Sequence, residues 1–187
     1  ESVNTLSFFG SSIHGETTDG AGLLADLVEK GIQLEASSLL ILGAGGSARS
    51  IVPSLLSKSP KHLFIANRTI EKAESLVGKY KTNHPQIALF DEDLNGKIRP
   101  DIVINATSAG TLNDSIFLPE ELFKSKPKVY DLAYSKDETA FNKIAKEGGS
   151  KEVHDGLGML IQQAALSFEI WNKFKPNTNG IEQKLRT

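Results

Sequence analysis

The chain has 187 residues, 39% of them hydrophobic, and is long enough to bury the core of one domain. Its 21 basic and 23 acidic residues are spread along the sequence and leave a net charge of -2, which argues against nucleic-acid and membrane partners. The absence of cysteine excludes disulfides and thiolate metal sites, and the four histidines are too far apart in sequence to indicate a metal site.

The start of the chain, residues 1–4, is neither a signal peptide nor an initiator methionine. No apolar run approaches the roughly 18 residues that a membrane-spanning helix needs. We therefore expect a cytoplasmic protein, and a chain that begins inside a longer one.

Short apolar runs alternate with longer segments of helical spacing, which is typical of repeated βαβ units. In chain order, the pattern predicts a helix over 20–30, a strand over 38–42, a helix over 46–57, a strand over 62–66, a helix over 70–80, a weak strand near 86–90, strands over 101–105 and 128–132, and helices over 136–147 and 157–173. The predicted fold class is α/β: a Rossmann-type, doubly wound, mainly parallel sheet with helices on both faces.

The last predicted helix carries apolar residues three or four positions apart, so one of its faces must be buried. We expect Phe168 and Trp171 to be core or domain-packing residues. Residues 176–180 then break the helical pattern, and the tail to Thr187 is expected to be a short surface piece.

A glycine-rich loop follows the strongest predicted strand and leads directly into a helix. Gly43 permits a tight turn, Gly45 lets the backbone approach a diphosphate, and Ala48 allows close packing of helix on strand. The helix N-terminus would then hold the diphosphate. The alternative is a glycine turn without a ligand, but strand, spacing and helix together favour a dinucleotide site. The predicted loop comprises Gly43, Ala44, Gly45, Gly46, Ser47 and Ala48.

The tip of the next predicted strand carries a basic side chain where an NAD-selective Rossmann domain has an acid. Arg68 can bind a 2′-phosphate with a planar fork of donors, so NADP is favoured over NAD. Asn67 and Thr69 can add neutral hydrogen bonds, and Lys72 a second positive charge. The alternative is that Arg68 and Lys72 are solvated residues at a helix start.

Seven separate stretches resemble the shikimate dehydrogenase family, in the family's order. They are VNT (3–5), TDGAG (18–22), GAGGSA (43–48), NRT (67–69), NATSAG (105–110), DLAY (131–134) and GLGMLIQQA (156–164). The resemblance implies reversible, NADPH-dependent reduction of 3-dehydroshikimate to shikimate, a step in the biosynthesis of chorismate and the aromatic amino acids. It also implies a substrate domain that precedes this stretch and supplies a catalytic lysine, which no residue here matches.

The resemblance also implies residue roles. Asp19 would be the catalytic partner of that lysine. The substrate would be bound by Asn4, Asp19, Tyr134 and Gln163. The nicotinamide half of NADP would lie along Asn105, Thr107 and Met159, and Ser108 and Gly156 would also bind the cofactor. The sequence departs from the family pattern in having Thr17 where the family has Asn, and Glu1-Ser2 before the VNT stretch where the family has Gly-Ala.

Each of these roles has a plainer alternative on local grounds. Thr18 or Asp19 could be the N-cap of the predicted first helix. Gln163 could be a solvated helix residue, Tyr134 a core aromatic and Met159 core filling. Only Asn105 and Thr107 favour a ligand without the resemblance, because they follow the carboxyl end of a strand.

We therefore expect residues 1–187 to form one NADP-binding domain, with 1–20 and 155–175 also lining a substrate cleft and packing on the absent substrate domain. Three alternatives remain: a paralogue acting on quinate or another hydroxylated ring acid, a non-catalytic NADP-binding module, and an amino-acid or folate dehydrogenase of similar architecture. The expected partner is a small-molecule substrate. The oligomeric state stays open, with a homodimer as the assembly considered.

Overall fold

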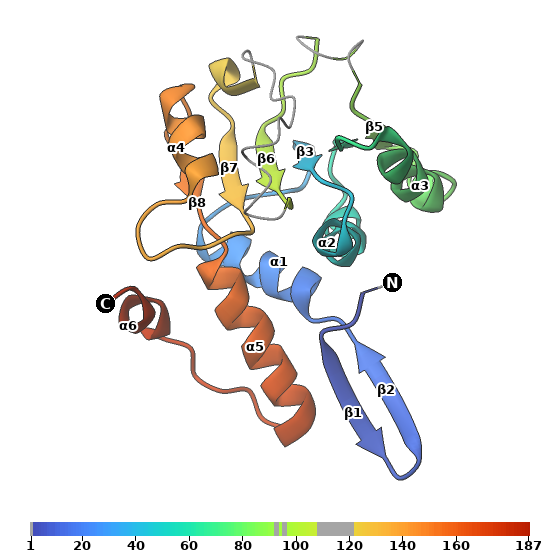
Figure 1. Ribbon diagram of the computed structural model, residues 1–187, viewed down its shortest axis with the longest axis vertical. Coiled ribbons are helices and arrows are strands. Elements are labelled where there is room, and N and C mark those ends of the chain that lie inside the picture. The colour runs from blue at the N-terminus through green and yellow to red at the C-terminus, as the bar shows by residue number, and fades with distance from the viewer. Residues whose placement is uncertain (1, 92–93, 95–96, 108–121) are drawn as a thin grey trace.

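The computed structural model describes residues 2–91, 94, 97–107 and 122–187 (Figure 1). The described part contains the strands β3 (Ser38–Leu42), β4 (His62–Ala66), β5 (Ile87–Leu89), β6 (Ile102–Asn105), β7 (Lys128–Asp131) and β8 (Val153–His154). They form a parallel sheet in the order β5-β4-β3-β6-β7-β8. From β3 the chain adds β4 and β5 on one side of the sheet and then β6, β7 and β8 on the other. Doubly wound sheets bind ligands at this switch point between β3 and β6.

Helices cover both faces of this sheet, as the sequence predicts. They are α1 (Asp19–Glu29), α2 (Gly46–Leu56), α3 (Ile70–Lys81), α4 (Ala140–Glu147), α5 (Leu157–Asn172) and α6 (Ile181–Arg186), with a 3-10 helix, η3, at Leu122–Ser125. Alternate side chains of β3 point to opposite faces. Leu39 and Ile41 enter the core under α1, α2 and α3, whereas Leu40 and Leu42 enter the core under η3 and α4.

A β-hairpin that the sequence pattern did not predict precedes α1. Its strands β1 (Thr5–Phe9) and β2 (Ser12–Glu16) pair antiparallel and project away from the sheet, beside the end of α5 (Figure 1). Apart from Thr5 its side chains are not buried, and Phe8, Phe9 and Ile13 are each at least 60% exposed. No buried face imposes an alternating pattern, and for this reason the hydrophobic period gives no signal.

Three further differences lie in the last third of the chain. The helix expected from residue 136 begins at Ala140, because the Thr139 side chain accepts a hydrogen bond from the Asn142 N–H and caps the helix there. The two-residue strand β8 is too short to give a periodic signal. The tail is a surface piece, as expected, but it contains the helix α6, which Arg186 holds to the domain by binding both carboxylate oxygens of Asp155 at 2.7 and 2.9 Å.

The far end of α5 is more exposed than its apolar period predicts. Phe168 is 38% exposed and Trp171 is 55% exposed, so neither is a core residue of this domain. The Trp171 indole N–H donates to the Leu6 carbonyl at 2.9 Å and ties the hairpin to α5. No helix in the described ranges is long and apolar enough to cross a membrane.

Candidate functional site

The glycine loop crosses the carboxyl edge of the sheet between β3 and α2. Gly43 has a φ of +109°, and a Cβ there would lie 3.0 Å from the Ala106 carbonyl oxygen, so the turn itself needs glycine. A Cβ on Gly45 or Gly46 would meet nothing within 4 Å. The open space lies at the N-terminus of α2, whose N-cap residue provides no side-chain hydrogen bond. The loop thus offers free N–H groups and room for a diphosphate.

Two other residues of the predicted loop anchor it to the core. Ala44 and Ala48 are buried in the core against the sheet, while Ser47 is exposed. Arg49, which sequence reasoning missed, lies in the same first turn of α2, and its Nε donates to the Ala44 carbonyl at 3.3 Å. The available signal was a basic residue in the first turn of the helix, where a cation is unfavourable unless an anion binds beside it.

Asn67, at the tip of β4, joins this loop to the next one. Its Oδ1 accepts from the Ala44 N–H at 3.0 Å and its Nδ2 donates to the Thr69 carbonyl at 2.8 Å. Asn67 therefore braces the site, and its contact with a cofactor stays a prediction. Arg68, Thr69 and Lys72 are exposed around it, at the start of α3. Two cations thus stand beside the edge at which the glycine loop opens.

The carboxyl ends of β6 and β7 carry a second buried brace. Asn105 Nδ2 donates to Asp131 Oδ1 at 2.9 Å, and Asn105 Oδ1 accepts from the Thr107 hydroxyl at 2.6 Å. Burial raises the pKa of the Asp131 carboxyl, while hydrogen bonds from Thr139, the Ala133 N–H and Asn105 oppose that rise. Ligand contacts of Asn105 and Thr107 stay predictions, and Ser108 lies outside the described residues.

The start of α5 packs tightly against the end of β7. The Gly156 N–H donates to the Ala133 carbonyl at 2.9 Å, and a Cβ on Gly156 would lie 2.1 Å from the Leu132 carbonyl oxygen, so a side chain there would displace the helix. Met159 is half-buried against the core, and Tyr134 is 55% exposed, which removes the core-aromatic alternative for Tyr134. Both lie at the carboxyl side of the sheet.

Of the four predicted substrate residues, Asn4, Asp19 and Gln163 come together although they are far apart in sequence. No contact within the described residues joins Tyr134 to them. Asn4 Nδ2 lies 2.6 Å from Asp19 Oδ1, 2.9 Å from Thr18 Oγ1 and 3.0 Å from Gln163 Oε1. The N-cap of α1 is Thr18, without a side-chain capping bond, so Asp19 is not the cap. We call Asn4, Thr18, Asp19 and Gln163 the amide–carboxylate cluster.

Two hydroxyls missed by sequence reasoning support this cluster from the buried side. Ser167 Oγ lies 2.7 Å from Thr5 Oγ1 and 3.0 Å from Thr18 Oγ1. Ser167 follows Gln163 by one helical turn, and this spacing was the only signal for it. The hydroxyls fix the hairpin to both helices and so hold Asn4 in position.

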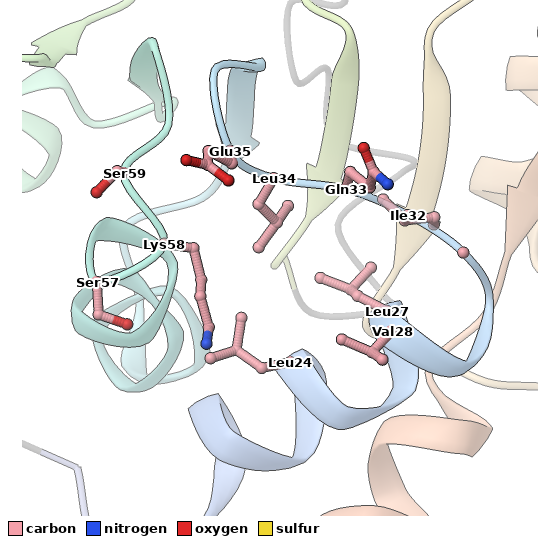
Figure 2. A pocket seen from close by; sticks show the side chains of 11 residues that line it. Leu24, Leu27, Val28, Ile32, Gln33, Leu34, Glu35, Ser57, Lys58 and Ser59 are labelled. Carbon is pink, nitrogen blue, oxygen red and sulfur yellow. The ribbon is translucent and has the colours of Figure 1, made fainter.

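The pocket in Figure 2 lies elsewhere. It has a volume of about 650 Å³ and lies between the end of α1, residues 31–35 and residues 57–59. Those segments precede β3 and β4, so the pocket lies at the amino ends of the strands. It shares no residue with the glycine loop or with the amide–carboxylate cluster. Within the described ranges, no group of His, Asp and Glu side chains could hold a metal ion.

The strand order, the switch point and the open glycine loop define a Rossmann-type α/β domain. Two family models match the chain: "Shikimate / quinate 5-dehydrogenase" over residues 26–132 and "Shikimate 5'-dehydrogenase C-terminal domain" over residues 156–186. The chain belongs to the shikimate dehydrogenase family.

Curated relatives agree with this assignment. The chain is 46% identical over 187 residues to a shikimate dehydrogenase (NADP(+)) of Legionella pneumophila, and 40% identical over 185 residues to that of Methylobacillus flagellatus. These alignments cover 99% and 98% of the chain but 68% of each relative. The chain therefore spans about two thirds of their length.

Solved structures have the same fold. A crystal structure of an Ael1 enzyme from Pseudomonas putida matches with a TM-score of 0.88 at 37% identity. Shikimate 5-dehydrogenase from Thermus thermophilus, in complex with NADP(H) and shikimate, matches with a TM-score of 0.82 at 30% identity. Each match covers 98% of this chain and 67% of the other.

Proposed function

We propose that this chain is the NADP-binding part of a shikimate dehydrogenase, an oxidoreductase that reversibly reduces 3-dehydroshikimate to shikimate. One observation carries the proposal: the space beside Gly45 and Gly46 is open, at an uncapped helix N-terminus, next to exposed Arg68 and Lys72. A diphosphate fits the first feature and a 2′-phosphate the second. The names of the curated relatives, which specify NADP(+), support the same cofactor.

When bound, NADPH would supply the hydride. Reducing a ketone also requires a positioned proton donor, and Asp19 suits the orientation of such a donor, since a carboxylate beside a lysine keeps that lysine protonated. Asn4 holds Asp19 through the 2.6 Å hydrogen bond, which limits the rotation of the carboxylate. The lysine itself would come from a separate substrate domain.

The hydrogen-bond inventory of the amide–carboxylate cluster suits a hydroxylated substrate. Asn4 Nδ2 carries two N–H groups but faces three acceptors, on Thr18, Asp19 and Gln163. The Thr18 hydroxyl can also donate to Gln163 Oε1, at 3.3 Å, so these acceptors can be paired within the cluster. A carboxylate and an amide oxygen each accept more than one hydrogen bond, so Asp19 and Gln163 can still accept from a donor outside the chain. Ring hydroxyls of shikimate would supply such donors, with Tyr134 near the substrate carboxylate or the nicotinamide.

Exposed apolar side chains support the proposal that residues 1–20 and 155–175 also pack on a substrate domain. Phe8, Phe9 and Ile13 on the hairpin and Trp171 on α5 are each at least 55% exposed. The hairpin and the end of α5 lie together at one end of the molecule (Figure 1). Large exposed apolar side chains gathered at one end of a molecule suit an interaction site.

Calorimetric titration of the folded chain with NADPH and with NADH tests the cofactor assignment. We expect a clear heat of association with NADPH and weaker binding of NADH, because only NADPH has the 2′-phosphate. No heat with NADP or NADPH at millimolar ligand would overturn the assignment. Profiling of the longer protein on shikimate and quinate then separates the two substrates. A non-catalytic module is disfavoured because a cofactor sensor does not need Asn4, Asp19 and Gln163.

A further inference from the structure

Two polar side chains with no assigned ligand role are completely buried where α1, α5 and β7 meet. Asp26 on α1 and Tyr130 on β7 both have 0% exposure, and the Tyr130 hydroxyl donates to Asp26 Oδ2 at 2.6 Å. Lys30 Nζ lies 2.8 Å from Asp26 Oδ1. A buried carboxylate is costly unless each oxygen is paired, and here each oxygen has a donor. Burial and the Asp26 carboxylate raise the pKa of the Tyr130 hydroxyl well above its ordinary value.

This pair lies directly against the first turn of α5. The backbone N–H of Met159 lies near the Tyr130 hydroxyl and lowers its pKa, against the larger effect of burial. A Cβ on Gly158 would lie 1.9 Å from Asp26 Oδ1, so glycine is what lets α5 come this close. The N-cap residue Gly156 has no side chain to cap the helix. The pair therefore packs directly against the start of α5, through the contact of Asp26 with Gly158.

The same two helices touch again nearer the amide–carboxylate cluster. A Cβ on Gly22 would lie 2.7 Å from the backbone nitrogen of Gln163. Asp26 is thus opposite Gly158 and Gly22 opposite Gln163, so α1 and α5 run antiparallel in a fixed register. Asp19 lies about one turn before Gly22. A shift of α5 at Asp26 would therefore move Gln163 relative to Asp19.

We propose that Tyr130 and Asp26 are positioning residues: the hydrogen-bonded pair holds the start of α5 against α1, and thereby sets where Met159 meets the nicotinamide half of NADP and where Gln163 stands beside Asp19. The inference rests on the proposed function, because it requires that the nicotinamide half of NADP binds beside Met159. On the cofactor, the pair should affect that half and not the adenosine half, because the hydrogen bond and ion pair of Asp26 join it to Tyr130 and Lys30, away from the glycine loop.

Comparing the dissociation constants of two ligands distinguishes this positioning role from a general contribution to stability. NADPH carries both halves of the cofactor, whereas adenosine 2′,5′-bisphosphate carries only the adenosine half with its 2′-phosphate. For Tyr130→Phe, we expect the Kd of NADPH to rise about tenfold, as for one lost oriented hydrogen bond, and that of the bisphosphate to change less than about twofold. Gly158→Ala removes no polar group but displaces the same contact, and should give the same pattern.

Val129→Ala is the matched control. Val129 is also fully buried and precedes Tyr130 on β7, but it points into the core on the other face of the sheet. It should lower the free energy of unfolding and leave the ratio of the two dissociation constants unchanged. The positioning role is overturned if both test variants weaken the two ligands equally, or weaken neither. If the unaltered chain binds neither ligand, the proposed function fails, and the positioning role with it.

Discussion

Gly43 and Gly45 are glycines for different physical reasons. Gly43 has a positive φ and lies against the Ala106 carbonyl, so the fold itself requires it. Gly45 has a φ of -79° and open space where its Cβ would be, so the backbone conformation does not require glycine there. The sequence motif predicts both positions. Only the coordinates separate the residue that makes the turn from the residue that leaves room for a ligand.

Gly45→Ala should therefore separate binding from stability. The φ of Gly45 suits alanine, and the gain from a less flexible unfolded chain is offset by the loss of a better N-cap residue. Stability should therefore change by less than about 1 kcal/mol, while the new methyl group blocks the diphosphate and NADPH binding falls. Thermal unfolding and calorimetry on the same preparation measure both effects. Gly43→Ala is the control and should lose stability, because alanine is strained at a φ of +109°. Unchanged NADPH binding by Gly45→Ala would rule out the diphosphate at this loop.

Arg68→Asp should weaken NADPH by about tenfold or more and NADH by about twofold or less, because a carboxylate would face the 2′-phosphate. Lys61→Asp is the matched control: it makes the same charge change just before β4, at the opposite end of that strand. It should affect neither cofactor. Equal losses for NADPH and NADH in the Arg68 variant would remove Arg68 from the role.

At the scale of elements, hydrophobic period predicted the buried strands of the sheet and the helices that cover them. It missed the hairpin, β8 and α6, and these share a physical cause. None of the three has a periodic apolar face that is buried. The hairpin and α6 are instead held by contacts between residues remote in sequence, such as Trp171 with Leu6 and Arg186 with Asp155. The bracing roles of Asn67 and Asn105 could not be predicted from sequence for the same reason. Their partners Ala44 and Asp131 lie on other strands or loops.

Arg186→Ala should release α6 from the domain. The change removes two charge-assisted hydrogen bonds to Asp155, which is 8% exposed, and we expect a loss of about 1–2 kcal/mol in the free energy of unfolding after allowing for solvent screening. Urea denaturation measures the loss. Lys184→Ala, on the same helix, should stay within about 0.5 kcal/mol. A similar effect for the two variants would show that the Asp155 pair does not hold α6.

At the scale of the whole molecule, folding brings Asn4, Asp19 and Gln163 into one hydrogen-bonded cluster from the two ends of the chain. The cluster lies where the hairpin, α1 and α5 meet, at the same end as the exposed apolar residues Phe8, Phe9 and Ile13. The proposed second wall of the substrate cleft would cover this end.

We therefore expect this chain alone to bind NADP and to oxidise shikimate poorly, because the proton-relay lysine and most substrate contacts would belong to the substrate domain. Following NADPH formation by absorbance, with shikimate and NADP present, measures the rate. The full-length shikimate dehydrogenase (NADP(+)) of Legionella pneumophila, assayed in the same way, is the control and should be fully active. Full-rate oxidation by this chain alone would contradict the proposed division of roles.

The sequence by itself determined the α/β class, the glycine loop and the cation at position 68, because each depends on local period or on a short motif beside a strand. Tertiary structure decided which polar side chains brace the site, how α1 and α5 are held in register, and that Asn4 reaches both Asp19 and Gln163. Local sequence encodes the conformation of a segment. Close approach between remote segments depends on packing that no single segment specifies, as where Gly158 admits Asp26.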